Sequence, residues 1–156
     1  MNLLTSLLSL PNVALDVEVR DKRDALQRAA RIFENNQGLS AAKILDSLLA
    51  REDLGSTGLG KGVAIPHGRL RGLKRAAAAI VRVRDAIQFD SPDGQPVRLL
   101  VVLLVPEHAT QQHLNILSEL AQMLSEPSMR EQLQTIVQPA ALLATVAAWE
   151  PIRPAA

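Results

Sequence analysis

The sequence predicts an α/β fold, a single domain over residues 1–150 with a mixed central β-sheet and helices on both sides of it. Strand-like segments alternate with amphipathic helical segments along the chain, which is the order of an α/β domain. Residues 97–105 are almost entirely apolar, as expected of a strand that is covered on both faces. A chain of 156 residues can bury roughly 70% of the surface that its unfolded form exposes, so one core is sufficient.

The elements of the first half follow from periodicity and capping residues. The apolar segment 1–10 lacks the basic region and cleavage site of a signal peptide, so we expect a short helical turn that closes the core. Apolar and polar residues alternate over 13–19, which is the period of a half-buried strand. A helix follows that Asp21 caps and that ends over 35–38, and a second helix begins at Ser40.

Further strands and helices are expected in the second half. Their ranges are 63–65 and 76–83 for the strands before the apolar one, and 111–124, 129–137 and 140–149 for the helices after it. Residues 85–96 are predicted to form a loop with a turn at 91–94. Ser128 and Glu131 have the spacing of a capping box. Residues 151–156 are expected to be a disordered tail.

The composition argues against several classes of function. The chain has 17 basic and 16 acidic residues and no cysteine. Disulfides, thiolate nucleophiles and cysteine-containing zinc sites are therefore excluded. The basic residues are dispersed, and two Phe and one Trp offer little for base stacking, so nucleic-acid binding is not indicated. The apolar segments are too short to span a bilayer, so we expect a cytoplasmic protein without membrane insertion.

A glycine-rich segment at residues 55–68 is the most informative local feature, since it has five glycines in fourteen positions. It leads into His67, which lies between Pro66 and Gly68. Glycine permits left-handed backbone angles and close approach of another group, whereas proline fixes its own φ and restricts the residue before it. Imidazole has an unperturbed pKa of about 6.5, so a neutral, nucleophilic nitrogen is available near neutral pH. The segment therefore sets a reactive ring beside exposed backbone amides.

Four other residues could support chemistry at His67. The amides and hydroxyls of Ser56 and Thr57 could hold an anion, and a phosphoryl group is an anion that would use both them and the ring. Arg51, at the end of the preceding helix, offers a planar fork of donors suited to phosphate oxygens, although alone it equally fits a solvated arginine at a helix end. His113 is expected at the start of the helix after the buried strand, where a helix N-terminus also favours an anion.

A metal site is the competing use of the histidines. His108 lies in the loop before His113, and spacing does not decide which of the two points inward. Binding of a metal by His67, His108 and His113 is not expected, because two of them are five residues apart, the third is distant, and no compact His/carboxylate pattern is present.

Nucleotide binding is the least expected function. Residues 55–61 match a phosphate-binding P-loop up to its lysine, but Gly62 stands where the P-loop needs Ser or Thr to ligate magnesium. A P-loop also needs a strand before it and a helix after it, whereas here a helix precedes the segment. Serine hydrolysis is not indicated either, because no Gly-x-Ser-x-Gly motif is present.

Two stretches, residues 51–68 and residues 96–107, resemble the IIA components of the phosphoenolpyruvate-dependent phosphotransferase system. The first reads Arg-Glu-x-Leu-Gly-Ser-Thr-Gly-Leu-Gly-x-Gly-Val-Ala-Ile-Pro-His-Gly, and the second begins with Pro-Val, ends with Leu-Leu-Val-Pro-Glu and is followed by His113 and Leu117. The resemblance covers most of residues 3–148. It is to the mannitol/fructose type and, within that type, to the nitrogen-regulatory branch, and it implies the same mixed sheet flanked by helices.

The resemblance also implies roles for individual residues. His67 would be the phosphoacceptor, carrying the phosphoryl group on Nε2 as tele-phosphohistidine. The second active-site histidine of the family corresponds to His113 and its arginine to Arg51, whereas His108 matches no functional position. The expected phosphate-binding loop consists of Ser56, Thr57, Gly58 and Gly60. No cofactor and no metal are implied.

The implied activity is a relay between proteins. An HPr-like carrier, charged by enzyme I from phosphoenolpyruvate, would donate the phosphoryl group. In the regulatory branch, to which the stretch 89–97 is closer, the phosphorylation state of His67 changes which proteins the chain binds, such as kinases or potassium transport proteins. In the alternative, the group passes to a IIB component during fructose or mannitol uptake. A further hypothesis is a protein-binding regulator in which the glycine-rich segment only docks partners.

Overall fold

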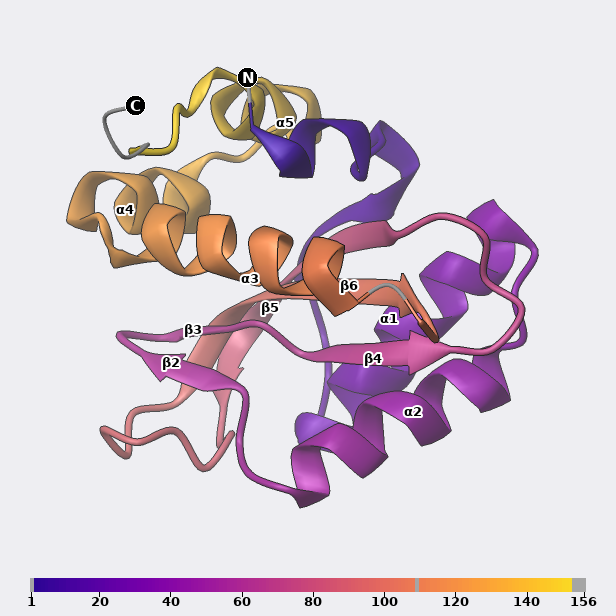
Figure 1. The fold of residues 1–156 in the computed structure, drawn as a ribbon. Coiled ribbons are helices and arrows are strands. Elements are labelled where there is room, and N and C mark those ends of the chain that lie inside the picture. The colour runs from indigo at the N-terminus through magenta and orange to yellow at the C-terminus, as the bar shows by residue number, and fades with distance from the viewer. Residues whose placement is uncertain (1, 109, 153–156) are drawn as a thin grey trace.

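The computed structural model describes residues 2–108 and 110–152 (Figure 1). Its helical elements are η1 (Leu3–Ser6), η2 (Leu10–Asn12), α1 (Lys22–Gln37), α2 (Ala41–Asp53), α3 (Thr110–Ser125), α4 (Pro127–Thr135) and α5 (Pro139–Ala148). Its strands are β1 (Val13–Val17), β2 (Gly58–Gly60), β3 (Val63–Ala64), β4 (His67–Leu70), β5 (Ala77–Ile87) and β6 (Val97–Pro106).

The strands form one mixed sheet, which confirms the predicted fold class. Their order is β1-β5-β6-β3-β2, and β4 pairs with β6. Strand β6 is antiparallel to β5 and parallel to both β3 and β4, whereas β1 is parallel to β5. Strands β2 and β3 form an antiparallel hairpin. Strand β6 is thus central, with β5 along one side and the short strands β3 and β4 in succession along the other.

Helices cover both faces of the sheet, as predicted (Figure 1). The segments η1, α3, α4 and α5 enclose one apolar core against the sheet, and α1 and α2 enclose the other. Successive side chains of a strand point to opposite faces, so Leu103 packs in the first core and Leu104 in the second. Strand β6 is buried on both sides, which explains why its sequence is apolar almost throughout.

The predicted caps of the first two helices are present. Asp21 accepts a hydrogen bond from the amide of Asp24, and Gly38 ends α1 in the left-handed conformation with φ 70°. Ser40 accepts from the amide of Lys43 at the start of α2. These caps satisfy backbone groups that no turn of the helix itself can reach, so the local sequence was sufficient to place them.

The capping box predicted at Ser128 and Glu131 is wrong. Helix α4 begins at Pro127, and Glu126 is its N-cap without a side-chain hydrogen bond. Proline suits the first turn because its missing N–H would have had no partner there. Ser128 therefore lies inside the helix, where its side chain cannot cap the first turn.

Three strand predictions differ from the structure. Strand β5 extends to Ile87, so the loop that was expected from residue 85 begins later. The glycine-rich segment contributes β2, which pairs with β3, and His67 begins the strand β4; no strand was predicted at either place. Each of these strands depends on backbone hydrogen bonds to a partner strand, and short polar or glycine-rich strands have little pattern of their own.

The end of the chain is only partly described. The backbone N–H of Ile152 donates to Oε1 of Gln122 at 3.0 Å, and the side-chain amide of Gln122 donates to the Ile152 carbonyl at 3.4 Å. The rest of the predicted tail, residues 153–156, lies outside the described residues. Within the described ranges, every helix is too short or too polar to cross a membrane.

Candidate functional site

A hollow of about 310 Å³ lies beside β4, between α2 and the start of α3. Its lining consists of Ser47, Ala50, Arg51, Leu54, His67, Gly68, Arg69 and His113. Three separate elements, α2, β4 and α3, therefore meet here. The structure brings together His67, His113 and Arg51, the three residues predicted for chemistry.

His67 is held in a defined orientation. It is buried at the start of β4, and its Nδ1 lies 2.7 Å from the carbonyl oxygen of Ile65. A carbonyl oxygen only accepts hydrogen bonds, so Nδ1 carries the proton and Nε2 of the neutral ring carries the lone pair. The amide of Leu103 donates to the Pro66 carbonyl at 2.9 Å and fixes the backbone just before the ring. The fold thus leaves the lone pair of the neutral ring on Nε2.

The surroundings of His67 favour the neutral form of its ring. Burial lowers the pKa of His67 below its ordinary value of 6.5, and the nearby Arg51 guanidinium lowers it further. The hydrogen bond to Ile65 and the Glu52 carboxylate act in the opposite direction on this pKa, without reversing the shift. A neutral ring is the form that can attack a phosphorus atom.

His113 lies next to His67 in the first turns of α3. The two ring centroids are 5.3 Å apart, and the rings meet edge to face at 63°. Burial is the largest cause of the lowered pKa of His113, and the nearby His67, Arg69 and Arg51 lower this pKa further. Its Nε2 is buried without a hydrogen-bond partner among the described residues. The ring therefore has a polar atom available for a group that enters the hollow.

Two arginines line the hollow from different elements. Arg51 lies in the last turn of α2, where Nη1 donates to the Gly55 carbonyl at 2.7 Å. Arg69 was not predicted, and its Nη1 donates to the Glu107 carbonyl at 2.9 Å. It follows His67 by two positions on the same strand, so both side chains lie on one face. Recognising β4 as a strand would have been enough to find Arg69.

Gly68 allows α2 to approach the site closely. A Cβ atom at this position would overlap Oγ of Ser47, which itself donates to the Arg69 carbonyl at 2.7 Å. Glycine is needed here for space, because residue 68 faces α2 directly. Because of this close approach, Ser47 and the other residues of α2 that line the hollow lie next to β4.

The predicted phosphate-binding loop does not line this hollow. The hydroxyl of Ser56 donates to the Phe89 carbonyl at 2.6 Å and accepts from the amide of Gly58 at 3.0 Å. The hydroxyl and amide of Thr57 both donate to Glu52. A Cβ atom at Gly58 would overlap Ser91, and Gly60 has φ 85°. The described contacts of Ser56, Thr57, Gly58 and Gly60 are structural, and their binding of phosphate stays a prediction.

Glu52 is a buried carboxylate that sequence reasoning missed. It receives the donors of Thr57 and forms an ion pair with Nζ of Lys22 at 3.1 Å. Lys22 also stacks on the ring of Phe89, with 4.6 Å from Nζ to the ring centroid. This network joins α1, the end of α2 and the glycine-rich segment. The network uses the hydroxyl and amide donors of Thr57.

The structure also shows where His108 lies and whether the described side chains could form a metal site. His108 is exposed in the turn between β6 and α3 and does not line the hollow. Within residues 2–108 and 110–152, no cluster of three or more His, Asp or Glu side chains could hold a metal ion.

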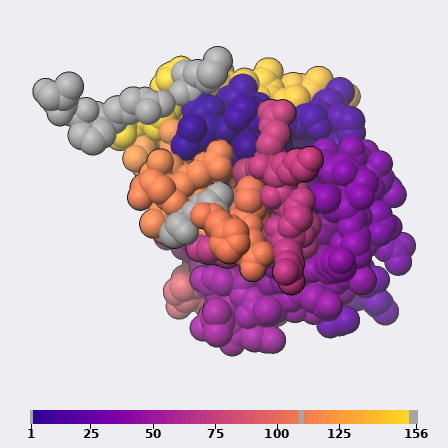
Figure 2. All heavy atoms as spheres, turned by 45° about the vertical axis from the view of Figure 1, so that its right-hand side comes forward, coloured from indigo at the N-terminus to yellow at the C-terminus, as the bar shows by residue number. Residues whose placement is uncertain are grey.

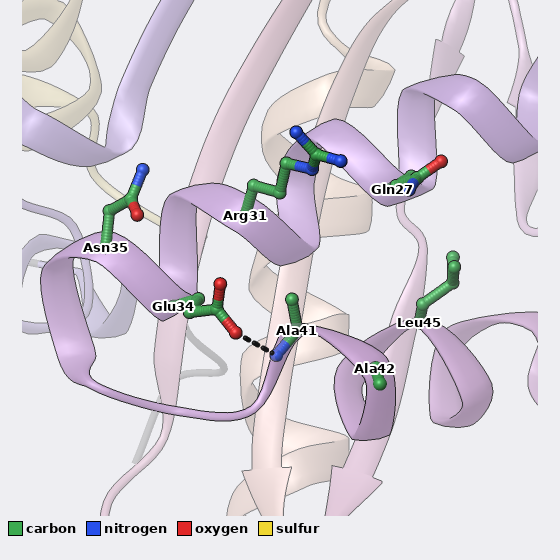
Figure 3. Close-up of a pocket in the computed structure, with 7 residues that line it drawn as sticks. All are labelled: Gln27, Arg31, Glu34, Asn35, Ala41, Ala42 and Leu45. Carbon is green, nitrogen blue, oxygen red and sulfur yellow. Dashed lines mark hydrogen bonds between the residues drawn. The ribbon is translucent and has the colours of Figure 1, made fainter.

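A second hollow, of about 440 Å³, lies between α1 and α2 (Figure 3). It is lined by Gln27, Arg31, Glu34, Asn35, Ala41, Ala42 and Leu45. The Glu34 carboxylate accepts from the Ala41 amide at 2.9 Å and thereby joins the two helices, as the dashed line in Figure 3 shows. None of the residues predicted for chemistry lies here, so the hollow at His67 is the candidate site.

The lowered pKa of His67 leads to a pH prediction. An NMR titration of its ring protons should give a midpoint below 6.5, because burial disfavours the charged ring. Between that midpoint and pH 6.5 the unfolded chain binds the proton and the folded chain does not, so the ring's contribution to stability falls on acidification. A peptide with the sequence Ile-Pro-His-Gly is the control. A midpoint for His67 at or above that of the peptide would contradict the prediction.

The chain is similar to known proteins along most of its length. The family model described as "Phosphoenolpyruvate-dependent sugar phosphotransferase system, EIIA 2" matches residues 6–149. A protein named nitrogen regulatory protein from Pseudomonas aeruginosa is 42% identical over 115 residues, which are 73% of this chain and 75% of that protein.

Two solved structures have the same fold. The nitrogen regulatory protein IIA-Ntr from Neisseria meningitidis superimposes with a TM-score of 0.88 and 46% identity, covering 93% of this chain and 99% of that one. The IIA mannitol protein from Escherichia coli superimposes with a TM-score of 0.76 and 19% identity, covering 89% of this chain and 98% of that one. The second likeness concerns the fold alone.

Proposed function

We propose a phosphoryl-accepting regulatory function for this chain, which belongs to the EIIA type-2 family of the phosphoenolpyruvate-dependent sugar phosphotransferase system. In this proposal, Nε2 of His67 accepts the phosphoryl group from an HPr-like carrier, which enzyme I charges. The observation that carries the proposal is the fixed orientation of the His67 ring. Its Nδ1 donates to the Ile65 carbonyl, so Nε2 keeps the lone pair, and the residue lines a hollow that His113 and Arg51 also line.

The transfer step requires placement and charge stabilisation rather than new chemistry. A bond forms between Nε2 of His67 and phosphorus as the bond between phosphorus and the carrier's histidine nitrogen breaks, and the electron pair of that bond returns to the carrier's ring. Nδ1–H of His67 stays bonded to the Ile65 carbonyl, which stabilises the positive charge that develops on the ring. Transfer of this kind passes through a loose transition state with charge spread over the equatorial oxygens.

The cationic lining takes up that charge. Arg51 and Arg69 lie on the hollow. Among the described residues each donates one hydrogen bond, to a backbone carbonyl, so further N–H groups remain for phosphoryl oxygens. His113, in the tautomer with its proton on Nε2, donates from an atom that has no other described partner. Preorganised donors of this kind in a partly dry site lower the barrier without a magnesium ion.

Removing either supporting group is expected to slow the transfer. Arg51→Ala and His113→Ala should each lower the rate from phosphorylated carrier to this chain about 100-fold, the effect typical of losing one preorganised donor. His67 remains the acceptor in both variants, so the final extent of labelling is unchanged. Rapid-quench single-turnover measurements give the rate, and Arg31→Ala, an exposed arginine of α1, is the matched control. Rates equal to the control in both variants would remove these residues from the proposal.

The regulatory reading is supported by the names of the similar proteins, nitrogen regulatory protein and IIA-Ntr. It requires that phosphorylation of His67 alter binding to target proteins, such as kinases or potassium transport proteins, in the cytoplasm. A phosphoryl group adds a charge of about −1.5 to −2, which changes any interface that covers the hollow. Comparing the affinity of a partner for the phosphorylated and unphosphorylated chain tests this, and equal affinities would favour a docking surface that ignores phosphorylation.

The sugar-uptake alternative makes a different prediction. The family description itself names a sugar phosphotransferase system, and the fold is shared with a IIA mannitol protein. If the chain serves uptake, its phosphoryl group passes rapidly to a fructose- or mannitol-type IIB domain. Transfer from the labelled chain to such domains separates the two readings.

A further inference from the structure

The segment that follows His67 is strongly basic. Arg69, Arg71, Lys74 and Arg75 fall within seven positions, and the segment 69–75 contains no acidic residue. All four side chains are exposed, and among the described residues none of them forms an ion pair. Basic residues are therefore clustered here, contrary to the dispersed distribution expected for the chain. With 17 basic and 16 acidic residues in all, the rest of the chain is net acidic.

This basic segment, residues 69–75, has a defined conformation. Leu70 is buried, and Leu73 packs against the core beneath α1 and α2. The amide of Leu73 donates to the Leu70 carbonyl at 3.3 Å, and Gly72 between them has φ 86°. Anchored leucines thus alternate with outward cations on a turn. Charges held in place in this way lose less conformational entropy when a partner binds.

The basic segment is continuous with the hollow at His67. Arg69 belongs to both, and Arg71 follows His67 by four residues, so their Cα atoms are at most about 14 Å apart. Figure 2 shows this stretch of chain as a pink strip on the surface, between the orange start of α3 and the violet helices. A standard interface covers about 800 Å² per partner, a disc of roughly 16 Å radius. A protein seated over His67 therefore reaches the basic segment.

Apolar side chains adjoin the hollow. Leu54, which lines it, is 85% exposed, and Leu114, next to His113 in the sequence, is 56% exposed. Interfaces combine an apolar centre with a polar rim. Leu54 on the hollow, Leu114 beside His113 in the sequence and the exposed cations that follow Arg69 fit this arrangement.

Resting on the proposed function, we propose that the basic segment docks an acidic surface of the phosphoryl donor protein, beside the donor's phosphorylated histidine. Like-charged donors would be repelled, whereas an acidic one is steered toward His67 by the same cations that attract its phosphoryl group. A protein partner fits better than a nucleic acid, because Phe33, Phe89 and Trp149 are all buried and offer no surface for base stacking.

The test compares two triple variants with equal changes in charge. In the segment variant, exposed cations beyond the hollow are neutralised by Arg71→Gln, Lys74→Gln and Arg75→Gln. In the control variant, exposed cations of α1 are neutralised by Arg23→Gln, Arg28→Gln and Arg31→Gln. The donor is the HPr-like carrier encoded in the same genome, used both phosphorylated, for transfer kinetics, and unphosphorylated, for direct binding by calorimetry.

The segment variant should raise KM for the phosphorylated carrier and Kd for the unphosphorylated carrier about tenfold at low salt, with kcat unchanged. The difference should vanish at high salt, and the control variant should match the parent chain. Unchanged Kd and KM in the segment variant would overturn the docking proposal while leaving phosphorylation of His67 intact. Carrier binding that depends on the segment, without any transfer to His67, would instead overturn the proposed function alone.

Two further probes test whether the basic segment binds a membrane or a nucleic acid instead of a protein. Phosphatidylglycerol vesicles and a duplex DNA are offered to the parent chain and to the segment variant. If the parent binds either probe, the segment variant does not, and carrier affinity is the same for both chains, the segment serves a membrane or a nucleic acid and the docking proposal is overturned.

Discussion

Replacing His67 by alanine is expected to abolish phosphorylation of the chain by phosphoenolpyruvate, enzyme I and an HPr-like carrier. The reason is that Nε2 of His67 is the nucleophile in the proposed transfer. The nearest other imidazole, His113, has no hydrogen bond to the described residues that would fix its ring as Ile65 fixes His67. Phosphohistidine is recognised as a label that is labile in acid and stable in base. Intact-protein mass spectrometry before and after acid treatment measures it.

The matched control is His108→Ala, which removes an exposed histidine outside the hollow and should label like the parent chain. Because His67 is buried, alanine could also loosen β4. His67→Gln, which keeps a polar side chain of similar length, separates the two effects, and thermal unfolding checks the fold of each variant. Labelling of a folded His67→Gln chain to the same extent as the parent would assign the acceptor to another residue.

Replacing Arg82 by methionine is expected to lower the free energy of unfolding by about 3 kcal/mol, the low end for breaking one side of a buried ion pair. Arg82 is only 1% exposed. Its Nε and Nη2 donate to the two Asp16 oxygens, each at 3.2 Å. Its Nη1 donates to the carbonyls of Leu133 at 3.1 Å and Ile136 at 2.6 Å, at the end of α4.

Methionine fills the space of the arginine stem but donates no hydrogen bonds. The carbonyls of Leu133 and Ile136 then lose their donor. Asp16 loses the hydrogen bond from Arg82, which is the largest cause of the lowered pKa of its carboxyl group. Asp16 is 46% exposed at its side chain and keeps Arg98, with Nη2 at 3.3 Å, which is why the low end of the range applies.

Urea unfolding at pH 7 measures the effect, with Arg84→Met as the control. Arg84 lies two positions further along β5, its side chain is 56% exposed, and it pairs with Glu18 and Asp85 at the surface. Its replacement should change the free energy of unfolding by no more than about 0.5 kcal/mol. Equal losses in the two variants would show that the Arg82 contacts add nothing beyond a surface charge.

Arg82 and Arg84 also show that the local sequence pattern does not predict which side chain is buried. Arg82 and Arg84 occupy equivalent positions in an alternating strand, and the sequence predicts the same face for both. In the structure the register of β5 against β6 is interrupted between Arg82 and Ile87, and α4 covers only the first arginine. Which arginine is buried depends on a neighbouring helix more than fifty residues away along the chain, so no local window contains the answer.

The residues of the candidate site also fall into two groups: those that the local sequence identifies and those that only the packing of distant elements brings in. His67 and Arg51 are recognisable from the composition and order of residues 51–68, because glycine, proline and a titratable ring occur together there. Arg69 and Ser47 were missed, since their places in the lining depend on β4 pairing with β6 and on the close packing of α2 at Gly68. The hydroxyls that looked available for an anion are engaged by Glu52 and Phe89.

The sequence by itself determined the α/β class, the capped helices and the buried strand β6, and it singled out His67 as the candidate acceptor, because periodicity, capping and glycine or proline geometry act over a few residues. Only the tertiary structure decided that His67 begins a strand, that it lines a hollow together with His113 and two arginines, and that the hydroxyls of Ser56 and Thr57 bond to Phe89 and Glu52. Those features depend on which backbones pair and which helices pack together, and such contacts join residues that are distant along the chain.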